Sequence, residues 1–267
     1  MSDSVSPPPI PACSHTVHVR LPDLSSCTPF ELRVNRHFRS VSRASEAWSA
    51  VKVGLWAALC YPGVDFSSLL VYEQERRRDG CCDENENEIT CVAYRSPVWY
   101  IRFHRSMRAY HDAKNASGLR LVFHLIEYAA GLDLPEWMSL LPVLKQLTDQ
   151  ACKIIAWSED AISCAKGMTP SSQLNIVTIL MKDRKCSFGS ALAYVGTLVK
   201  QCVDAFLATD CRFAACTVMD DDTRRYVRGL RDCIAGSVNW LYETERYLGT
   251  KGNEFRAFGW VFVLALD

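Results

Sequence analysis

The chain has 267 residues, of which 49% are apolar, and its 30 lysines and arginines balance its 30 aspartates and glutamates. This apolar content is enough to build a sizeable core without disulfide or metal staples. A neutral chain argues against broad binding to nucleic acids or anionic membranes, because both need a positive field.

The first residues, 1–17, are polar and rich in proline, so we expect a disordered lead there and one domain over residues 18–267. With no apolar signal core and an odd number of cysteines, 13, the sequence predicts a reduced, cytoplasmic protein with small apolar cysteines in its core. The spacing of Cys81, Cys82 and Cys91 fits no standard zinc pattern, which argues against a zinc site. No apolar run reaches the roughly 18 residues that cross a bilayer, so we expect no membrane span.

Apolar residues at steps of three and four predict helices along most of the chain. The predicted segments are Pro29–Trp48, Val51–Tyr61, Trp99–His111, Leu119–Ala130, Leu140–Ser163, Leu174–Met181, Phe188–Leu207 and Asp222–Tyr247. We expect Trp260–Leu266 to be either the end of a buried helix or an artefact of the gene model, and residues 71–116 to be irregular, with a truncation around this stretch. Because alternating apolar and polar residues are scarce, the pattern predicts a single all-α domain of about ten helices.

The string from Trp157 to Gly167 is the first that indicates chemistry. Positions 159, 163 and 167 are four residues apart and therefore lie along one face of a helix. Three oxygen ligands at this spacing could hold a hard divalent cation such as Mg²⁺. Glu159 and Ser163 carry suitable oxygens, whereas Gly167 has no side chain, so a neighbouring group or water would have to replace that ligand.

The second string is Asn239–Gly249, which contains Arg246 and Tyr247. An arginine offers a planar fork of donors to phosphate oxygens, and a tyrosine adds one hydroxyl donor. A cation at the C-terminus of a helix, favoured by the helix dipole, is the alternative interpretation of Arg246.

These two strings resemble the signatures of class I terpene synthases, in particular the sesquiterpene synthases of basidiomycete fungi. The first resembles their second metal motif, in which Asn, Ser and Glu stand where this chain has Glu159, Ser163 and Gly167. The second resembles their C-terminal Arg-Tyr motif, which binds the substrate diphosphate. Further ordered matches spread the resemblance over roughly residues 18–70 and 99–250.

The resemblance implies the class I terpenoid synthase helical bundle, lacking one or two helices of the full fold. It also implies a metal site formed by Glu159, Asp160 and Ser163, and roles for Arg246 and Tyr247 in catalysis and diphosphate binding. Family members carry an aspartate-rich motif where this chain has the acidic segment beginning at Asp83, so that residue and Asn87 are the candidate metal ligands there. Lys114 stands where the family has an arginine that senses the diphosphate, and a lysine holds phosphate as a point charge only.

The resemblance thus implies a magnesium-dependent sesquiterpene synthase that ionises and cyclises farnesyl diphosphate, or a related prenyl diphosphate, as a monomer or homodimer. Trp56, Phe123, Trp157 and Trp240 are candidates for lining its apolar pocket, although for each of them an ordinary core position is the favoured interpretation. One alternative is a catalytically impaired descendant that keeps the bundle and diphosphate binding, and another is an unrelated helical interaction module. The first two hypotheses require the helix that carries Ser163 to meet the helix that ends near Tyr247.

Overall fold

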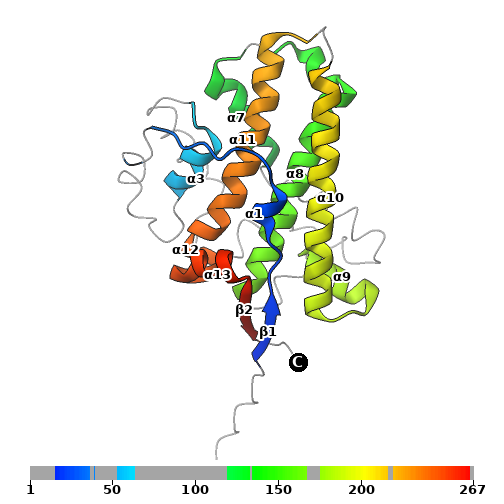
Figure 1. Ribbon diagram of the computed structural model, residues 1–267. Coiled ribbons are helices and arrows are strands. Elements are labelled where there is room, and N and C mark those ends of the chain that lie inside the picture. The colour runs from blue at the N-terminus through cyan, green and yellow to red at the C-terminus, as the bar shows by residue number, and fades with distance from the viewer. Residues whose placement is uncertain are drawn as a thin grey trace, which may run out of the picture.

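The computed structural model describes residues 16–36, 39, 53–63, 119–132, 134–166, 175–215 and 219–264. Three long helices, α8 (Pro142–Ser163), α10 (Phe188–Ala214) and α11 (Asp221–Glu243), run side by side through its centre (Figure 1). α3 (Val53–Cys60) and α7 (Leu119–Ala130) pack on α11, and α9 (Ile176–Arg184) packs on α10. The predicted all-α class is confirmed.

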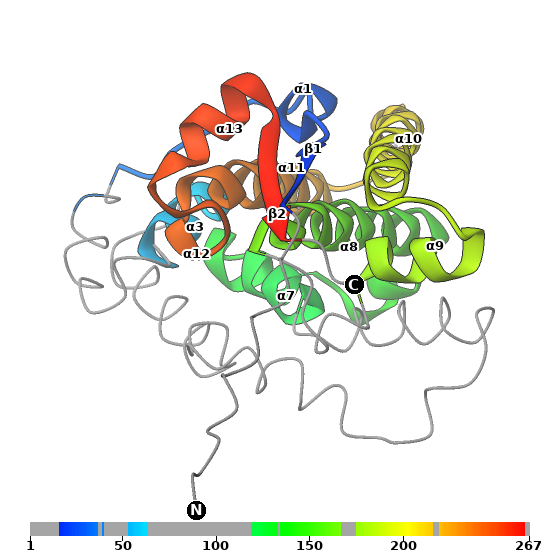
Figure 2. The same ribbon diagram turned by 90° about the horizontal axis from the view of Figure 1, so that it is seen from below.

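Shorter elements gather at one end of the bundle. η4 (Cys164–Lys166) continues from the C-terminus of α8 at this end, whereas η3 (Glu136–Leu140) leads into the N-terminus of α8 at the opposite end. α12 (Glu245–Leu248), η6 (Gly249–Lys251) and α13 (Gly252–Phe258) follow α11, and Figure 2 shows α13 lying across this end near α12. The C-terminal part of the chain thereby returns to the place where α8 ends.

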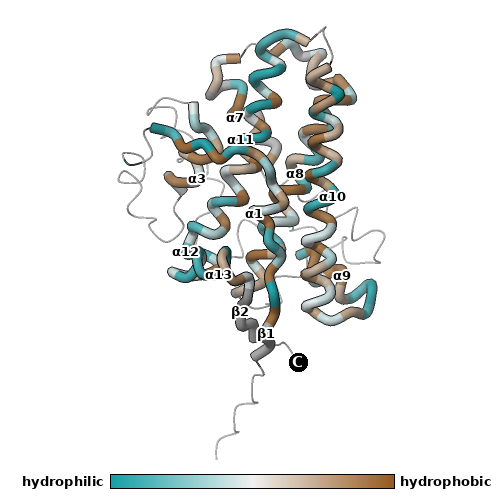
Figure 3. Tube along the Cα trace, in the orientation of Figure 1, coloured by the Kyte–Doolittle hydropathy of each residue, from teal (hydrophilic) through white to brown (hydrophobic). Residues whose placement is uncertain are grey.

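The core follows from the amphipathic faces of these helices, and hydrophilic and hydrophobic residues alternate along α10 and α11 (Figure 3). α8 buries Leu147 and Ile154 completely, and α10 does the same with Leu192 and Phe206. α10 is long and apolar enough to cross a membrane by length and composition alone, a test that core helices also pass. Close to half of its apolar stretch is buried in the bundle.

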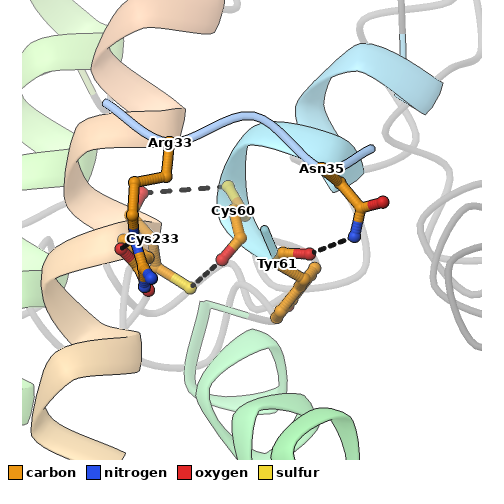
Figure 4. A network of polar contacts seen from close by, with 6 residues as sticks. Arg33, Asn35, Cys60, Tyr61 and Cys233 are labelled. Atoms are coloured by element: carbon orange, nitrogen blue, oxygen red, sulfur yellow. Dashed lines mark hydrogen bonds and ion pairs between the residues drawn. The ribbon is translucent and has the colours of Figure 1, made fainter. Parts of the chain in front are cut away.

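α3 approaches α11 so closely that a glycine is needed between them. A Cβ atom on Gly236 would lie 2.6 Å from the carbonyl carbon of Leu59 and 2.7 Å from the backbone nitrogen of Cys60. Figure 4 shows how sulfur contacts join the same two helices: the Cys60 thiol points to the Cys233 carbonyl and the Cys233 thiol to the Cys60 carbonyl, at 3.8 and 3.7 Å. The backbone-to-backbone approach makes this a rigid contact.

The prediction of a helix beginning at Pro29 is wrong for residues 29–36, which are not helical, whereas residue 39 is helical. The segment pairs with α3 and α11 through polar groups: Asn35 donates from its backbone to Ala58 and from its side chain to the Tyr61 carbonyl. Arg33, which is labelled in Figure 4, forms an ion pair with Asp232 of α11. Val34 in this segment is half exposed.

The prediction of a helix near the C-terminus is also wrong, because Trp260–Leu264 forms the strand β2. β2 pairs antiparallel with β1 (Thr16–Arg20), with Thr16 opposite Leu264 and Arg20 opposite Trp260. β1 begins two residues inside the segment expected as a disordered lead. Pairing with a partner so distant in sequence has no local signal, which is why the apolar run suggested a helix.

The remaining helices lie close to their predicted positions, with two differences. α10 extends to Ala214, seven residues beyond the predicted end. The helix predicted over Asp222–Tyr247 is interrupted at Thr244, where α11 ends and α12 begins. Trp99–His111 and residues 40–48 lie outside the described residues.

Candidate active site

The C-terminal turns of α8 carry the residues of the first string. Glu159 is half-buried, Asp160 is buried, and Ser163 ends the helix one turn after Glu159. α12 packs against η4 and this end of α8. The predicted meeting of the two helices is therefore observed.

Thr244 makes the turn that brings α12 to α8. Its backbone N–H donates to the Trp240 carbonyl and closes α11, while its side-chain oxygen accepts from the Arg246 N–H at 3.3 Å and caps α12. Thr244 is completely buried, so the direction of this turn is held by the core. α12 ends at Gly249, whose φ of 58° and ψ of −148° lie in a region that only glycine adopts easily.

Tyr247 joins the two strings directly. Its hydroxyl donates a hydrogen bond of 2.8 Å to Oε1 of Glu159, across 88 positions of sequence. Its ring meets Trp240 edge to face at 6.3 Å, and the Arg246 guanidinium carbon lies 5.4 Å from the centre of the same ring. The side chains implied in diphosphate binding and the first residue of the metal string thus form one cluster.

Asp160 has a structural task in this arrangement. Its Oδ2 accepts the backbone N–H of Ile176 at 2.9 Å, so it caps the N-terminus of α9. Its carbonyl accepts from the Asn175 side chain at 2.8 Å and from the Ser163 hydroxyl at 3.1 Å. Direct metal ligation by Asp160 stays a prediction, and the structure gives its carboxylate a role in joining α8 to α9.

Asn175 was not among the predicted site residues, and it holds Ser163 in place. Its Oδ1 caps α9 by accepting the Val177 N–H at 2.8 Å, and its Nδ2 donates to Ser163 Oγ at 3.3 Å. An asparagine directly before an apolar helical run is an N-cap signal that the sequence displays. The contact to Ser163 has no such signal, because it depends on how α9 folds back.

Burial also makes the thiol next to this cluster unreactive. Cys164 is buried, and burial followed by the charge of Asp160 raises the pKa of its thiol to about 12. Cys202 has a pKa raised to about 11 by burial alone. These thiols stay protonated at neutral pH and act as apolar core groups.

Other predicted residues are less informative. Asp83, Asn87, Lys114 and Gly167 lie outside the described residues. Trp56, Phe123, Trp157 and Trp240 are all buried. Of these four rings, Trp240 contacts Tyr247 edge to face within the cluster.

The C-terminal metal-binding model of terpene synthase family 2 matches residues 105–205. Sesquiterpene synthase Agr1 of Cyclocybe aegerita is 23% identical to this chain over 93% of the chain and 94% of that protein. Agr3 of the same fungus is 32% identical over 60% of the chain, and α-muurolene synthase of Coprinopsis cinerea is 32% identical over 56%. The chain spans 46% and 36% of the lengths of these two proteins. The chain is therefore similar in sequence to fungal sesquiterpene synthases.

Solved terpene synthases share its fold. α-Eudesmol synthase superposes with a TM-score of 0.62 at 15% identity, over 81% of this chain and 98% of that one. Wild-type cucumene synthase superposes with a TM-score of 0.58 at 16% identity, over 81% and 99%. The sequence similarities argue against the alternative of an unrelated helical module.

The oxygen donors at the end of α8 suit a hard cation. Glu159 offers a carboxylate, and Ser163 directs its hydroxyl proton to the Asp160 carbonyl and accepts from Asn175, which leaves one oxygen lone pair. Carboxylate and hydroxyl oxygens are the ligands that Mg²⁺ prefers. Among the described residues, no group of three or more His, Cys, Asp or Glu side chains is placed to hold a metal, so any ion here needs further ligands from substrate, water or other parts of the chain.

Proposed function

We propose that the chain is a magnesium-dependent sesquiterpene synthase, a carbon–oxygen lyase that ionises and cyclises farnesyl diphosphate and releases diphosphate in the cytoplasm. The observation that carries this proposal is the contact between Glu159 and Tyr247, which unites the metal string and the Arg-Tyr string in one cluster. The relatives named above are sesquiterpene synthases, which supports farnesyl diphosphate as the substrate.

Each residue of the cluster has a part in this reaction. Glu159 and Ser163 would hold Mg²⁺, and the ion when bound stabilises the charge of the departing diphosphate as a Lewis acid. Arg246 provides a fork of charged donors for the diphosphate oxygens. Asp160 and Asn175 fix the end of the metal-bearing helix, so that its donors are positioned before substrate arrives.

The apolar surroundings have a second task, because the allylic cation must be kept from water. Trp240 is buried beside Tyr247 and presents an aromatic ring close to the polar cluster. Aromatic faces stabilise cations by electrostatic attraction. We therefore place the hydrocarbon part of the substrate on the Trp240 side of the cluster.

The test is incubation of the purified protein with farnesyl diphosphate and Mg²⁺, with analysis of the volatile products by gas chromatography and mass spectrometry. We expect a cyclic sesquiterpene from the wild type. Arg184→Gln should give the same product, because Arg184 is an exposed arginine that contacts Tyr194 and does not belong to the cluster. Arg246→Gln is expected to lose the product. Absence of any volatile product from the wild type at all metal concentrations would refute the proposed activity.

A second candidate is a catalytically impaired descendant that still binds diphosphate. It is favoured by one feature of the sequence, the glycine at position 167 where the family carries a glutamate ligand. It predicts that inorganic diphosphate with Mg²⁺ raises the melting temperature of the wild type and not of Arg246→Gln, while no product forms.

A further inference from the structure

One side-chain amide joins the ends of two helices beside the first string. Asn175 is buried, and its Oδ1 accepts the Val177 N–H at 2.8 Å, which caps the N-terminus of α9. Its Nδ2 donates to the Asp160 carbonyl at 2.8 Å and to Ser163 Oγ at 3.3 Å. The last four carbonyls of an α-helix have no partner within the helix. The donation to the Asp160 carbonyl therefore satisfies a group that the C-terminus of α8 leaves open.

The same contacts fix the direction of the Ser163 hydroxyl. A serine hydroxyl has one proton and two lone pairs, and its proton rotates to suit its neighbours. Here the proton points to the Asp160 carbonyl at 3.1 Å, and the Asn175 amide takes one lone pair. The other lone pair is the one that a cation can use. Ser163 is only half-buried, so a ligand can reach this oxygen.

The amide of Asn175 is itself held in one orientation. Exchanging its oxygen and nitrogen would set Oδ1 against the Asp160 carbonyl and Nδ2 against the Val177 N–H, and both contacts would be repulsive. The residues that follow it, Ile176 and Val177, are completely buried. The Ile176 N–H also donates to Oδ2 of Asp160 at 2.9 Å, which fixes the start of α9 on α8. The amide is thus a rigid support for a hydroxyl that could otherwise rotate.

We propose that Asn175 is a positioning residue of the metal site, and that its amide fixes the direction in which Ser163 presents its oxygen to a divalent cation. α9 carries none of the ligands that the sequence predicts, so the proposal gives this helix a part in metal affinity beyond its packing on α8. It rests on the proposed function in taking Ser163 as a metal ligand. Groups that hydrogen-bond to a ligand and orient it commonly contribute 10- to 100-fold to metal affinity, and for one neutral bond we expect about 10-fold.

Asn175→Ser separates the donations of the amide from the helix cap. Serine keeps an oxygen that can cap α9 and loses both donations, and the net charge of the protein is unchanged. Mn²⁺ is the probe, because it accepts the same oxygen ligands as Mg²⁺ and is followed by electron paramagnetic resonance, with and without inorganic diphosphate. We expect Asn175→Ser to weaken Mn²⁺ binding about 10-fold. An unchanged dissociation constant would show that Asn175 only joins α8 to α9, and would overturn the proposal.

Ser163→Ala identifies the Mn²⁺ site that is measured, because only binding that this substitution weakens involves the serine. In the Ser163→Ala background, Asn175→Ser should not weaken Mn²⁺ binding further, since the hydroxyl that it orients is absent. It should still lower the melting temperature, because the donation to the Asp160 carbonyl does not depend on Ser163. A further loss of binding in the double variant would show that Asn175 acts through the fold of α8, contrary to the proposal.

Ser187→Ala is the matched control for the loss of a helix cap. Ser187 is the N-cap of α10 and accepts the Ser190 N–H at 3.3 Å. Ser187→Ala should lower the melting temperature and bind Mn²⁺ like the wild type. Binding is measured at a temperature at which thermal unfolding shows every variant to be fully folded. Weaker binding by Ser187→Ala would show that metal affinity simply follows stability, which would also contradict the positioning role.

Failure of this proposal can be told from failure of the proposed function. If the wild type converts farnesyl diphosphate and Asn175→Ser binds Mn²⁺ equally well, or Ser163→Ala does, only the positioning role is refuted. If Mn²⁺ binding responds to both substitutions as expected and the wild type forms no product, the positioning role stands and the proposed activity is refuted. If the wild type neither forms product nor binds Mn²⁺ under either condition, both proposals are refuted.

Discussion

Replacing Asn175 by alanine tests the connection that fixes the C-terminal end of α8. The substitution removes the cap on the Val177 N–H, which costs about 1 kcal/mol. It also removes two hydrogen bonds, to the Asp160 carbonyl and to Ser163 Oγ, each of which contributes roughly 0.5–1.5 kcal/mol. We expect the free energy of unfolding to fall by about 3 kcal/mol in total.

For a domain of this size, 1 kcal/mol corresponds to a change in melting temperature of roughly 2–4 °C, so Asn175→Ala should melt roughly 6–12 °C below the wild type. The assay is thermal unfolding followed by circular dichroism, with urea unfolding for the free energy. Ser187→Ala is the matched control, because Ser187 is an exposed N-cap of α10 that accepts only one backbone N–H, from Ser190. It should cost about 1 kcal/mol.

Equal shifts in the two variants would refute the reasoning, since they would show that the bonds from Asn175 to α8 contribute nothing beyond the cap. Asn175→Ser offers a further check, because serine keeps a capping oxygen and loses both donations. Its melting temperature should lie between those of Asn175→Ala and the wild type.

Three other predictions concern the bundle around the site. Gly236→Ala places a methyl group against the backbone of α3. The resulting overpacking outweighs the roughly 1 kcal/mol gain in helix propensity, so urea unfolding should show a free energy of unfolding lower by about 2 kcal/mol. Gly189→Ala, whose new methyl group has ordinary contact distances, should be neutral or stabilising, and equal effects of the two changes would contradict the close approach. Asp220 caps α11, and hydrogen bonds from the side chain and then the backbone of Thr223 lower the pKa of its carboxyl group below 3.8. The ionised carboxylate therefore stabilises the fold above that pH, and this stabilisation is lost as the pH falls through the lowered pKa. The wild type should therefore melt above Asp220→Asn at neutral pH, and the difference should shrink below pH 3.8; a constant difference would argue against this linkage. Cys211 is exposed, so mass spectrometry after brief alkylation of the native protein should find it modified before the buried cysteines described above. Modification of the buried cysteines before Cys211 would refute their burial.

Much of the helical framework could be predicted from local patterns. Leu119–Ala130 was predicted with the bounds that the structure has, and α8 begins within two residues of its prediction, at a proline that suits a first helical turn. These helices have one continuous apolar face, and the 3.6-residue period reveals such a face without any tertiary information.

Segments held by distant partners could not be predicted in this way. Residues 29–35 belong to a segment with the apolar spacing of a helix and are not helical, and Asn35 and Arg33 bond instead to the α3 segment and to α11. The run that forms β2 is rich in valine and aromatic residues, which favour a strand, but so short an apolar run is ambiguous, and its pairing with β1 decides its conformation.

The site shows the same division. By itself the sequence determined the two strings and the spacing that places Glu159 and Ser163 on one helical face, because helix geometry depends only on neighbouring residues. Only the tertiary structure decided that Tyr247 bonds to Glu159 and that Asn175 holds Ser163, since these contacts cross 88 and 12 positions of sequence. Such contacts depend on the turn at Thr244 and on the return of α9 to α8, which are set by packing of the whole bundle.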